Sequence, residues 1–558
     1  MIVLFESARY TTETLRGFLG ERFYRELNAS EAQIDYVGYY YQAPASHSAL
    51  LLPKVFLKDG KFAGLSPTEL LDLQLTDAKE ARQRLYEAGK SEFLFRFGVW
   101  LYQAIKIFGQ RHPDTSITES ADLQHITQPE GQQYLSELEV ISSLLRFHHD
   151  NPTLFTFIKR YNSSQRHQVS WPRTVQKKIP VLQNGQPLYV ETINKQKNID
   201  SDEELFVLFF SVLEHLNEQY GFKTSLSPLY ATVTKGEFQK LLNGQGVRRL
   251  REIRGKYFSD KMRQLWQLLY AFFARAERTK TQQGTRELLL VRDFDIVFED
   301  MIDALLTDSE KPLPRKLKEH KDGKALDHIY EYASLLTPED TIYHIGDSKY
   351  YQEHSDFGET SVYKQYTYAR NVIQLNIDLL NDGKLAMPLR YRDNLTEGYN
   401  ITPNFFISAL VNDTLDFKDN GLSQRGSTLK PNRHFSDRLF DRDTLILQAY
   451  NINFLYVLAN YVSKNKQETE QFRQRAKQQF RARLMQYLAE NYAFWKVTPQ
   501  HDSLETFVTT HFQLLNGKMY RPAQFEKAIL VALEKNSSSQ NITEALRSIA
   551  LVETYSLA

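Results

Sequence analysis

The chain of 558 residues contains no cysteine, which excludes a disulfide framework, a catalytic thiol and a cysteine-ligated zinc site. Its longest apolar runs, "LFVLFFSVL" from Leu205 and "NFLYVLANYV" from Asn453, are far shorter than the roughly 20 residues that a membrane-spanning helix needs. The N-terminus has an acid at Glu6 and no basic segment before a long apolar stretch, so it does not resemble a signal peptide. We therefore expect a soluble cytoplasmic protein with no membrane segment.

An excess of charge of one sign is also missing, because 69 Lys and Arg residues oppose 68 Asp and Glu residues for a net charge of +1. A nucleic-acid surface would have to come from local segregation of charge. The sequence has neither a G-x-x-x-x-G-K-[ST] phosphate loop nor a G-x-S-x-G serine motif. If the protein uses nucleotide energy, a partner must supply it.

The chain has enough apolar residues, 42%, to form several cores, and its length predicts three or four domains of about 150 residues each. We expect an α+β multidomain protein. Residues 1–120 mix strand-like runs with a helical stretch, and residues 121–285 are basic and mostly helical. Residues 286–390 combine strands and helices around a set of acids, and residues 391–558 are expected to be mostly helical.

The basic segment is the place where charge does segregate. Residues 151–290 contain 22 Lys and Arg residues against 12 Asp and Glu residues, interleaved with aromatic side chains such as Trp171 and Tyr257. This pattern suits a surface that follows a phosphate backbone, although for either basic stretch taken alone a solvated helix face is the simpler explanation. The candidate DNA-binding residues are Arg173, Lys177, Arg248, Arg249, Arg251, Arg254 and Lys256.

Two stretches near the C-terminus predict helices. "RLFDRDTLILQAYNINFLYVLANYV" is expected to form one capped helix with an apolar face. "FRQRAKQQFRARLMQYL" places Arg473, Lys477 and Arg481 on one stripe of an amphipathic helix, beside an apolar stripe. We expect this basic stripe to be solvated; contact with a backbone phosphate or an acidic partner is the alternative.

Two acids lie in strand-like runs that a turn at Pro338 separates, in "ALDHIYEYASLLTPEDTIYHIGDSK". If the runs form an antiparallel hairpin centred near Thr337, the numbers of paired residues sum to 674 and Asp327 faces Asp347. Like charges at such positions repel, so a cation between them would explain the arrangement. Lys349 follows Asp347 by two residues and projects from the same face of the strand.

A third acid, Glu299, lies on the flank of a predicted helix in "RELLLVRDFDIVFEDMIDALL". Three carboxylates provide the hard oxygen ligands that Mg²⁺ or Mn²⁺ prefers. A metal ion and a neighbouring lysine can together catalyse phosphodiester hydrolysis. The metal polarises the phosphoryl group, and the lysine orients or helps to deprotonate the attacking water. The sequence thus predicts a metal site made by Glu299, Asp327 and Asp347, with Lys349 as the partner of the water.

The order Glu299, Asp327 and Asp347-Ser348-Lys349 resembles the PD-(D/E)xK nuclease motif, with "LDHIYEY" and "IGDSKYY" as its two strands. The following "SVYKQYTYARN" resembles the glutamine-containing helix of the McrC-like and LlaJI-like restriction subunits, which points to Gln365 and, with its altered spacing, to Tyr368. Leu326 stands where the motif usually has proline, a residue that shapes the backbone and binds no metal.

The resemblance implies a restriction-endonuclease-like core over residues 286–390 and a Mg²⁺-dependent deoxyribonuclease that acts on DNA with a McrB-like AAA+ GTPase or ATPase, with a homo-oligomer possible. Gln365 would support the site from behind the carboxylates or touch a backbone phosphate. One alternative is a catalytically inactive DNA-binding or scaffolding subunit of such a complex. Another is a helical interaction protein in which Asp347 and Lys349 form only a surface ion pair.

Overall fold

The computed structural model describes residues 2–17, 19–42, 48–121, 137–155, 158–162, 168–198, 203–220, 224–281, 286–307, 326–351, 358–381, 391–427, 437–463 and 465–557. The chain forms two compact units whose segments alternate along the sequence. Unit 1 comprises Met1–Leu52, Ala63–Tyr102 and Ser116–Val291, and unit 2 comprises Pro53–Phe62, Gln103–Thr115 and Arg292–Ala558. Both units contain sheets and helices, so the predicted α+β class is confirmed.

Unit 1 begins with a five-stranded sheet in the order β1-β6-β5-β12-β7. Its strands are β1 (Ile2–Phe5), β6 (Ser48–Leu52), β5 (Tyr36–Gln42), β12 (Arg286–Arg292) and β7 (Thr118–Ala121). A three-stranded sheet accompanies it, made of β2 (Arg9–Thr11), β4 (Glu31–Ile34) and β3 (Tyr24–Glu26). The helices of this part are α1 (Thr12–Arg16), α2 (Pro67–Thr76), α3 (Ala78–Glu87) and the first half of α4 (Ser91–Arg111).

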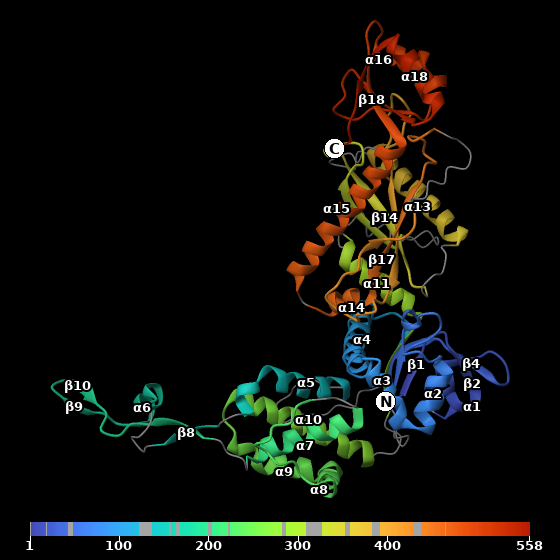
Figure 1. The fold of residues 1–558 in the computed structure, drawn as a ribbon. Coiled ribbons are helices and arrows are strands. Elements are labelled where there is room, and N and C mark those ends of the chain that lie inside the picture. The colour runs from blue at the N-terminus through green and yellow to red at the C-terminus, as the bar shows by residue number, and fades with distance from the viewer. Residues whose placement is uncertain are drawn as a thin grey trace. The chain divides into compact units, whose positions relative to one another are not determined.

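The rest of unit 1 is the basic segment, and most of it is helical, as expected (Figure 1). Its helices are α5 (Glu137–Asp150), α7 (Glu204–Tyr220), α8 (Lys235–Lys240), α9 (Gly246–Ile253) and α10 (Asp260–Thr281). Between α5 and α7 lies an arm, residues 168–198, which carries α6 (Trp171–Lys177) and the hairpin of β9 (Val181–Gln183) and β10 (Gln186–Leu188). The arm ends in β11 (Asn194–Asn198), which pairs with β8 (Ile158–Asn162).

Unit 2 is built on a five-stranded sheet in the order β13-β14-β15-β17-β16. The strands are β13 (His328–Ala333), β14 (Thr341–Lys349), β15 (Pro403–Leu410), β17 (Ile446–Asn453) and β16 (Ser423–Gln424). The pair β13–β14 is an antiparallel hairpin, whereas β14, β15 and β17 run parallel. The sheet therefore extends beyond residue 390, the predicted end of the core, because strands β15 and β17 both follow that residue in the sequence.

Helices cover both faces of this sheet, which explains why the residues of β14 after Thr341 are all buried (Figure 1). On one face, α13 (Glu359–Asn381) packs Tyr368, Ala369 and Val372 against Ile345 and Phe406. On the other face lie α11 (Phe294–Leu306), α14 (Phe454–Val462) and α15 (Lys466–Asn491). Phe480 of α15, for example, packs against Tyr450 of β17 with ring centroids 4.1 Å apart.

The single helix predicted in "RLFDRDTLILQAYNINFLYVLANYV" is wrong, because the structure divides this stretch. Ile446–Asn453 is a buried strand, and a helix begins only at Phe454, with the Asn453 side chain capping its first turn. A continuous apolar run fits a buried parallel strand as well as a buried helix, so its periodicity could not separate the two.

The basic stripe of α15 is also not solvated as we expected. Lys477 is only 3% exposed and lies over the ring of Tyr330, with Nζ 4.5 Å from the centroid. Arg473 donates to the backbone carbonyl of Ala304, and Arg481 donates to that of Ser334. Two cations of the stripe thus donate to backbone carbonyl groups and the third lies over an aromatic ring, a use of charge that a helical pattern does not reveal.

The C-terminal residues add a second sheet in the order β19-β20-β18-β21. Its strands are β19 (Met519–Tyr520), β20 (Ile529–Glu534), β18 (Tyr492–Pro499) and β21 (Ala550–Thr554), and its helices are α16 (Leu504–Thr510), α17 (Phe512–Leu515) and α18 (Ser537–Arg547). The region predicted to be mostly helical thus also supplies strands to two sheets. None of the helices in the described part of the chain combines the length and apolar composition of a membrane span.

Candidate active site

The candidate site forms at the end of β14, where the predicted acid and lysine project from the same face of the strand. Lys349 Nζ lies 2.5 Å from Asp347 Oδ2, and the two side chains are only 10% and 5% exposed. This contradicts the alternative in which they form a surface ion pair. A buried ion pair gains little net stability because both charges lose water, so its presence favours a functional role.

Asp327 lies beside this pair, as the predicted hairpin register requires. His328 pairs with Gly346 and Ile329 with Ile345, so paired numbers sum to 674 and the register is confirmed. Asp327 precedes the first of these pairs and stands opposite Asp347. Burial, followed by the charges of Asp347 and Glu299, raises the pKa of the Asp327 carboxyl, while Lys349 acts in the opposite direction.

Gly346, just before the acid, is required by close packing across the sheet. A Cβ atom at this position would lie 2.2 Å from Cζ of Phe405, a residue of the neighbouring strand β15. The ring of Phe405 stacks with His328 and contacts the ring of Phe480 of α15 at a tilt. The glycine therefore lets an aromatic ring fill the space behind the acids.

Glu299 approaches from α11 and is half-buried. Its charge contributes to the raised pKa of both Asp327 and Tyr368, after the larger effect of burial, so the three predicted carboxylates share one neighbourhood. The helix is held at this end of the sheet by aromatic contacts, because Phe294 and Phe298 pack against Tyr350, one residue beyond Lys349.

Gln365 occupies a core position on α13, in line with the stripe formed by Tyr368, Ala369 and Val372. It is fully buried, and neither Oε1 nor Nε2 of its amide has a hydrogen-bond partner among the described residues. An unpaired amide in such a position costs free energy, typically about 1–3 kcal/mol.

The donor set fits a divalent cation in its chemistry. Mg²⁺ commonly takes one or two carboxylates and retains several waters, and Asp327 with Asp347 supplies two adjacent carboxylates whose repulsion a cation would relieve. Among the described residues, no three Asp, Glu or His side chains already stand in a ligating arrangement. Glu299 would therefore have to change its side-chain conformation, or bind through water, to join them.

The predicted DNA-binding residues lie on two elements of unit 1. Arg248, Arg249 and Arg251 are exposed on α9, and Arg254 and Lys256 follow directly. Several are engaged locally: Arg249 binds Glu204, and the Arg254 guanidinium lies 5.5 Å from the Trp266 ring centroid. Arg173 and Lys177 are exposed on α6, in the arm.

Two cations near the site were missed by sequence reasoning. Lys54 comes from the Pro53–Phe62 segment of unit 2 and places Nζ 4.7 Å from the centroid of Tyr350. Arg425 donates to Oγ of Ser408, the residue that pairs with Lys349 across β14 and β15. No local pattern could have found them, because both reach the site only through the tertiary fold.

The geometry predicts that Asp327→Asn stabilises the protein in the absence of divalent metal. A raised pKa destabilises the folded state once the pH exceeds the unfolded-state pKa of about 3.9, and the amide removes this cost. We expect a gain of about 1 kcal/mol or more in the free energy of unfolding at pH 7.5 with EDTA, and a smaller gain at pH 5. Urea unfolding measures it.

The control is Asp413→Asn, which changes an exposed acid that pairs with Lys58 and should alter stability by less than about 0.5 kcal/mol. Loss of stability in Asp327→Asn at both pH values would contradict this description of the site.

Comparison with known proteins agrees with the restriction-subunit resemblance. The model of the LlaJI restriction endonuclease family matches residues 101–407, which include every residue of the candidate site. No curated protein matches the chain. Among solved structures, the chain is similar to one described as a refined half-complex from a tetradecameric assembly of Thermococcus gammatolerans McrB AAA+ hexamers with bound McrC.

That likeness covers 86% of this chain and 99% of the other, with 11% sequence identity and a TM-score of 0.27, which is too remote to establish a common fold. The family match stands on its own, because it spans more than half of the 558 residues. The predicted resemblance to LlaJI-like restriction subunits is thereby confirmed. The chain belongs to the LlaJI restriction endonuclease family.

Proposed function

We propose that this chain is the nuclease subunit of a restriction system and hydrolyses DNA phosphodiesters at a PD-(D/E)xK site in unit 2. The observation that carries the proposal is the buried Lys349–Asp347 pair with Asp327 opposite it. Family membership supports the same reaction class. A scaffolding subunit without activity would have no use for a buried acid whose pKa is raised by burial and by a second acid placed opposite it.

In this proposal each side chain has a distinct task. Asp327 and Asp347 would bind the metal ion, which is Mg²⁺ or, as a substitute, Mn²⁺. Glu299 would complete the ligand set directly or through a water molecule. When bound, the cation supplies Lewis acidity toward the scissile phosphate and the attacking water. Lys349, held by Asp347, positions that water and assists its deprotonation. The unpaired amide of Gln365 binds a carboxylate or a phosphate oxygen.

DNA would be gripped by the basic residues of α9 and the turn after it. Arg248 is strongly exposed, with a side-chain exposure of 85%, and Arg251 and Lys256 also face solvent. Exposed guanidinium and ammonium groups on one short element suit contacts with successive phosphates. On DNA binding, Arg249 and Arg248 would exchange the carboxylates of Glu204 and Glu252 for phosphate oxygens.

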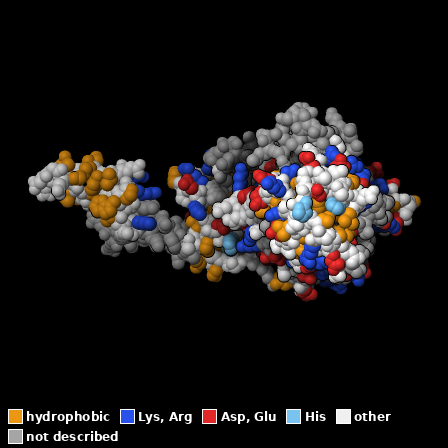
Figure 2. Space-filling model, turned by 90° about the horizontal axis from the view of Figure 1, so that it is seen from above, with side chains coloured by type: hydrophobic (Ala, Val, Ile, Leu, Met, Phe, Trp, Pro, Cys, Tyr) orange, Lys and Arg blue, Asp and Glu red, His pale blue; other side chains and the backbone are white. Residues whose placement is uncertain are grey.

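The arm supports the proposal of a protein partner. Large apolar side chains are exposed along it: Trp171, Val175, Ile179, Val181, Leu182, Leu188 and Val190. Figure 2 shows hydrophobic side chains gathered on the arm. A concentration of this kind marks a protein–protein interface, and since the chain has no phosphate loop, we propose that its partner is a McrB-like AAA+ GTPase or ATPase.

The central test is cleavage of plasmid DNA with Mg²⁺ or Mn²⁺ by the full chain, alone and with the proteins encoded beside it plus GTP or ATP. Asp347→Ala and Lys349→Ala should each lower the cleavage rate at least about 100-fold without unfolding the protein, because each removes a group that acts on the reacting phosphate or water. Lys496→Ala is the matched control, since it removes a lysine from an ion pair in the C-terminal sheet.

Cleavage at the wild-type rate by folded Asp347→Ala would contradict the proposed site. Absence of cleavage under all these conditions, on modified and unmodified DNA, would favour the scaffolding subunit.

A crossed experiment separates the two proposed surfaces. Arg248→Gln with Arg254→Gln should weaken DNA binding and reduce the slope of log K against log salt by about two, because each basic residue that contacts phosphate contributes roughly one. Trp171→Ser with Leu182→Ser should abolish binding of the partner and leave that slope unchanged. Leu551→Ser, an exposed apolar residue elsewhere, is the control. If instead the arm variant lost DNA binding and the arginine variant lost binding of the partner, the roles of the two surfaces would have to be exchanged.

A further inference from the structure

A buried contact joins α11 to β13 close to the candidate site. Nδ1 of His328 lies 3.5 Å from Oδ1 of Asp303, the long limit of a hydrogen bond, with side-chain exposures of 0% and 11%. A carboxylate only accepts, so this hydrogen bond requires the tautomer in which Nδ1 of His328 carries the hydrogen. Two polar side chains thus lose most of their hydration to meet at this place.

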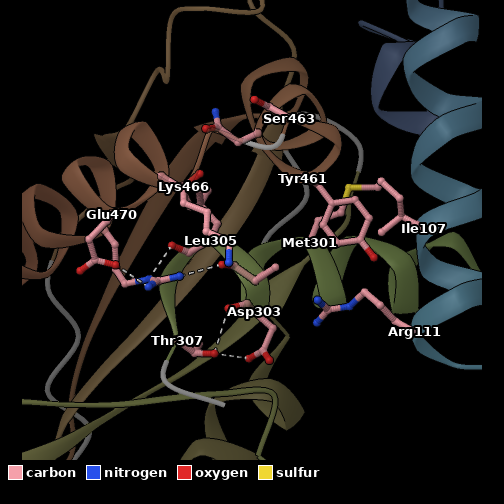
Figure 3. Close-up of a pocket in the computed structure, with 14 residues that line it drawn as sticks. Ile107, Arg111, Met301, Asp303, Leu305, Thr307, Tyr461, Ser463, Lys466 and Glu470 are labelled. Atoms are coloured by element: carbon pink, nitrogen blue, oxygen red, sulfur yellow. Dashed lines mark hydrogen bonds and ion pairs between the residues drawn. The ribbon is translucent and has the colours of Figure 1, made fainter. Parts of the chain in front are cut away.

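The partners of the contact are themselves held in place. Thr307 donates its hydroxyl to Asp303 Oδ1 at 2.7 Å, an interaction visible in Figure 3. On the other side, the imidazole of His328 stacks on Phe405, with an angle of 13° between the ring planes. The contact therefore fixes α11 relative to β13, because Thr307 holds the carboxylate of Asp303 and Phe405 holds the ring of His328.

Its position relates it directly to the proposed metal ligands. Asp303 follows Glu299 by four residues, so the two side chains lie on the same face of α11, one turn apart. His328 is the first residue of β13, and Asp327 directly precedes it. The contact therefore joins α11, one turn after Glu299, to the first residue of β13, directly after Asp327.

We propose that Asp303 and His328 are a positioning pair that sets the separation of Glu299 and Asp327, and so the affinity of the site for its divalent cation. The inference rests on the proposed nuclease function. Neither residue touches substrate in this account; each acts through the ligand that its own element carries. Groups of this kind, which orient ligands from behind, commonly change metal affinity about 10- to 100-fold when they are removed.

Asp303 also lines a cavity, and the experiment must distinguish a role in this cavity from the contact with His328. The cavity has a volume of about 740 Å³, and Arg111, Lys466 and other residues of unit 2 also line it (Figure 3). If a ligand in this cavity were the reason for the carboxylate, other cavity residues would matter equally. Lys466→Gln changes the cavity wall and leaves the contact with His328 intact.

The experiment is a titration of the full chain with Mn²⁺, followed by EPR of the free ion, on protein without DNA. His328→Ala and Asp303→Leu should each weaken Mn²⁺ binding about 10-fold, and the double variant should be no weaker than either, because the two residues act in series. His328→Asn keeps a donor near the position of Nδ1 and should restore most of the affinity.

Lys518→Met is the control for stability, since it breaks a comparably buried ion pair with Asp437 away from α11 and β13. It should lower the unfolding temperature and leave Mn²⁺ affinity unchanged. Wild-type affinity in His328→Ala, or an equal loss in Lys466→Gln or Lys518→Met, would overturn the positioning role. Asp347→Asn tests the proposed metal site separately from the positioning pair. If this variant binds Mn²⁺ as the wild type does, the metal site is wrong and the positioning pair is wrong with it.

Discussion

Three carboxylates are held together at the end of one β-strand, and the repulsion between them is the constraint around which unit 2 is organised. Asp327 and Asp347 stand opposite each other across a hairpin, and Glu299 adds a third negative charge. Lys349 offsets part of this charge from within hydrogen-bonding distance. A fold can keep such a cluster only if rigid elements on every side prevent the acids from moving apart.

The surrounding structure supplies that rigidity. The acids sit on a sheet whose strands are buried on both faces, so neither strand of the hairpin can shift its register without moving its apolar residues out of the core. Helix α15 secures the opposite face with Arg473 and Arg481 on backbone carbonyls and Lys477 over Tyr330. The contact of Asp303 with His328 extends the same principle to the helix that carries Glu299.

Sequence reasoning succeeded where the chemistry is local. The hairpin register followed from the turn at Pro338 and the alternation of two short strands, and it put Asp327 opposite Asp347. It failed where partners are distant in the chain: β17 was interpreted as part of a helix, because a fully buried strand has no alternation to reveal it. Lys54 and Arg425 approach the site from other segments, and α15 directs its cations inward for reasons that only the packed structure contains.

The position of a bound metal ion would decide whether these acids form a metal site. Crystals of the wild-type chain soaked in Mn²⁺ would be examined for anomalous scattering at the manganese edge. We expect an anomalous peak from Mn²⁺ within about 2.2 Å of carboxylate oxygens from both Asp327 and Asp347, a usual distance for a small divalent cation. Ordered carboxylates at this place with no peak between them, at saturating Mn²⁺, would contradict it.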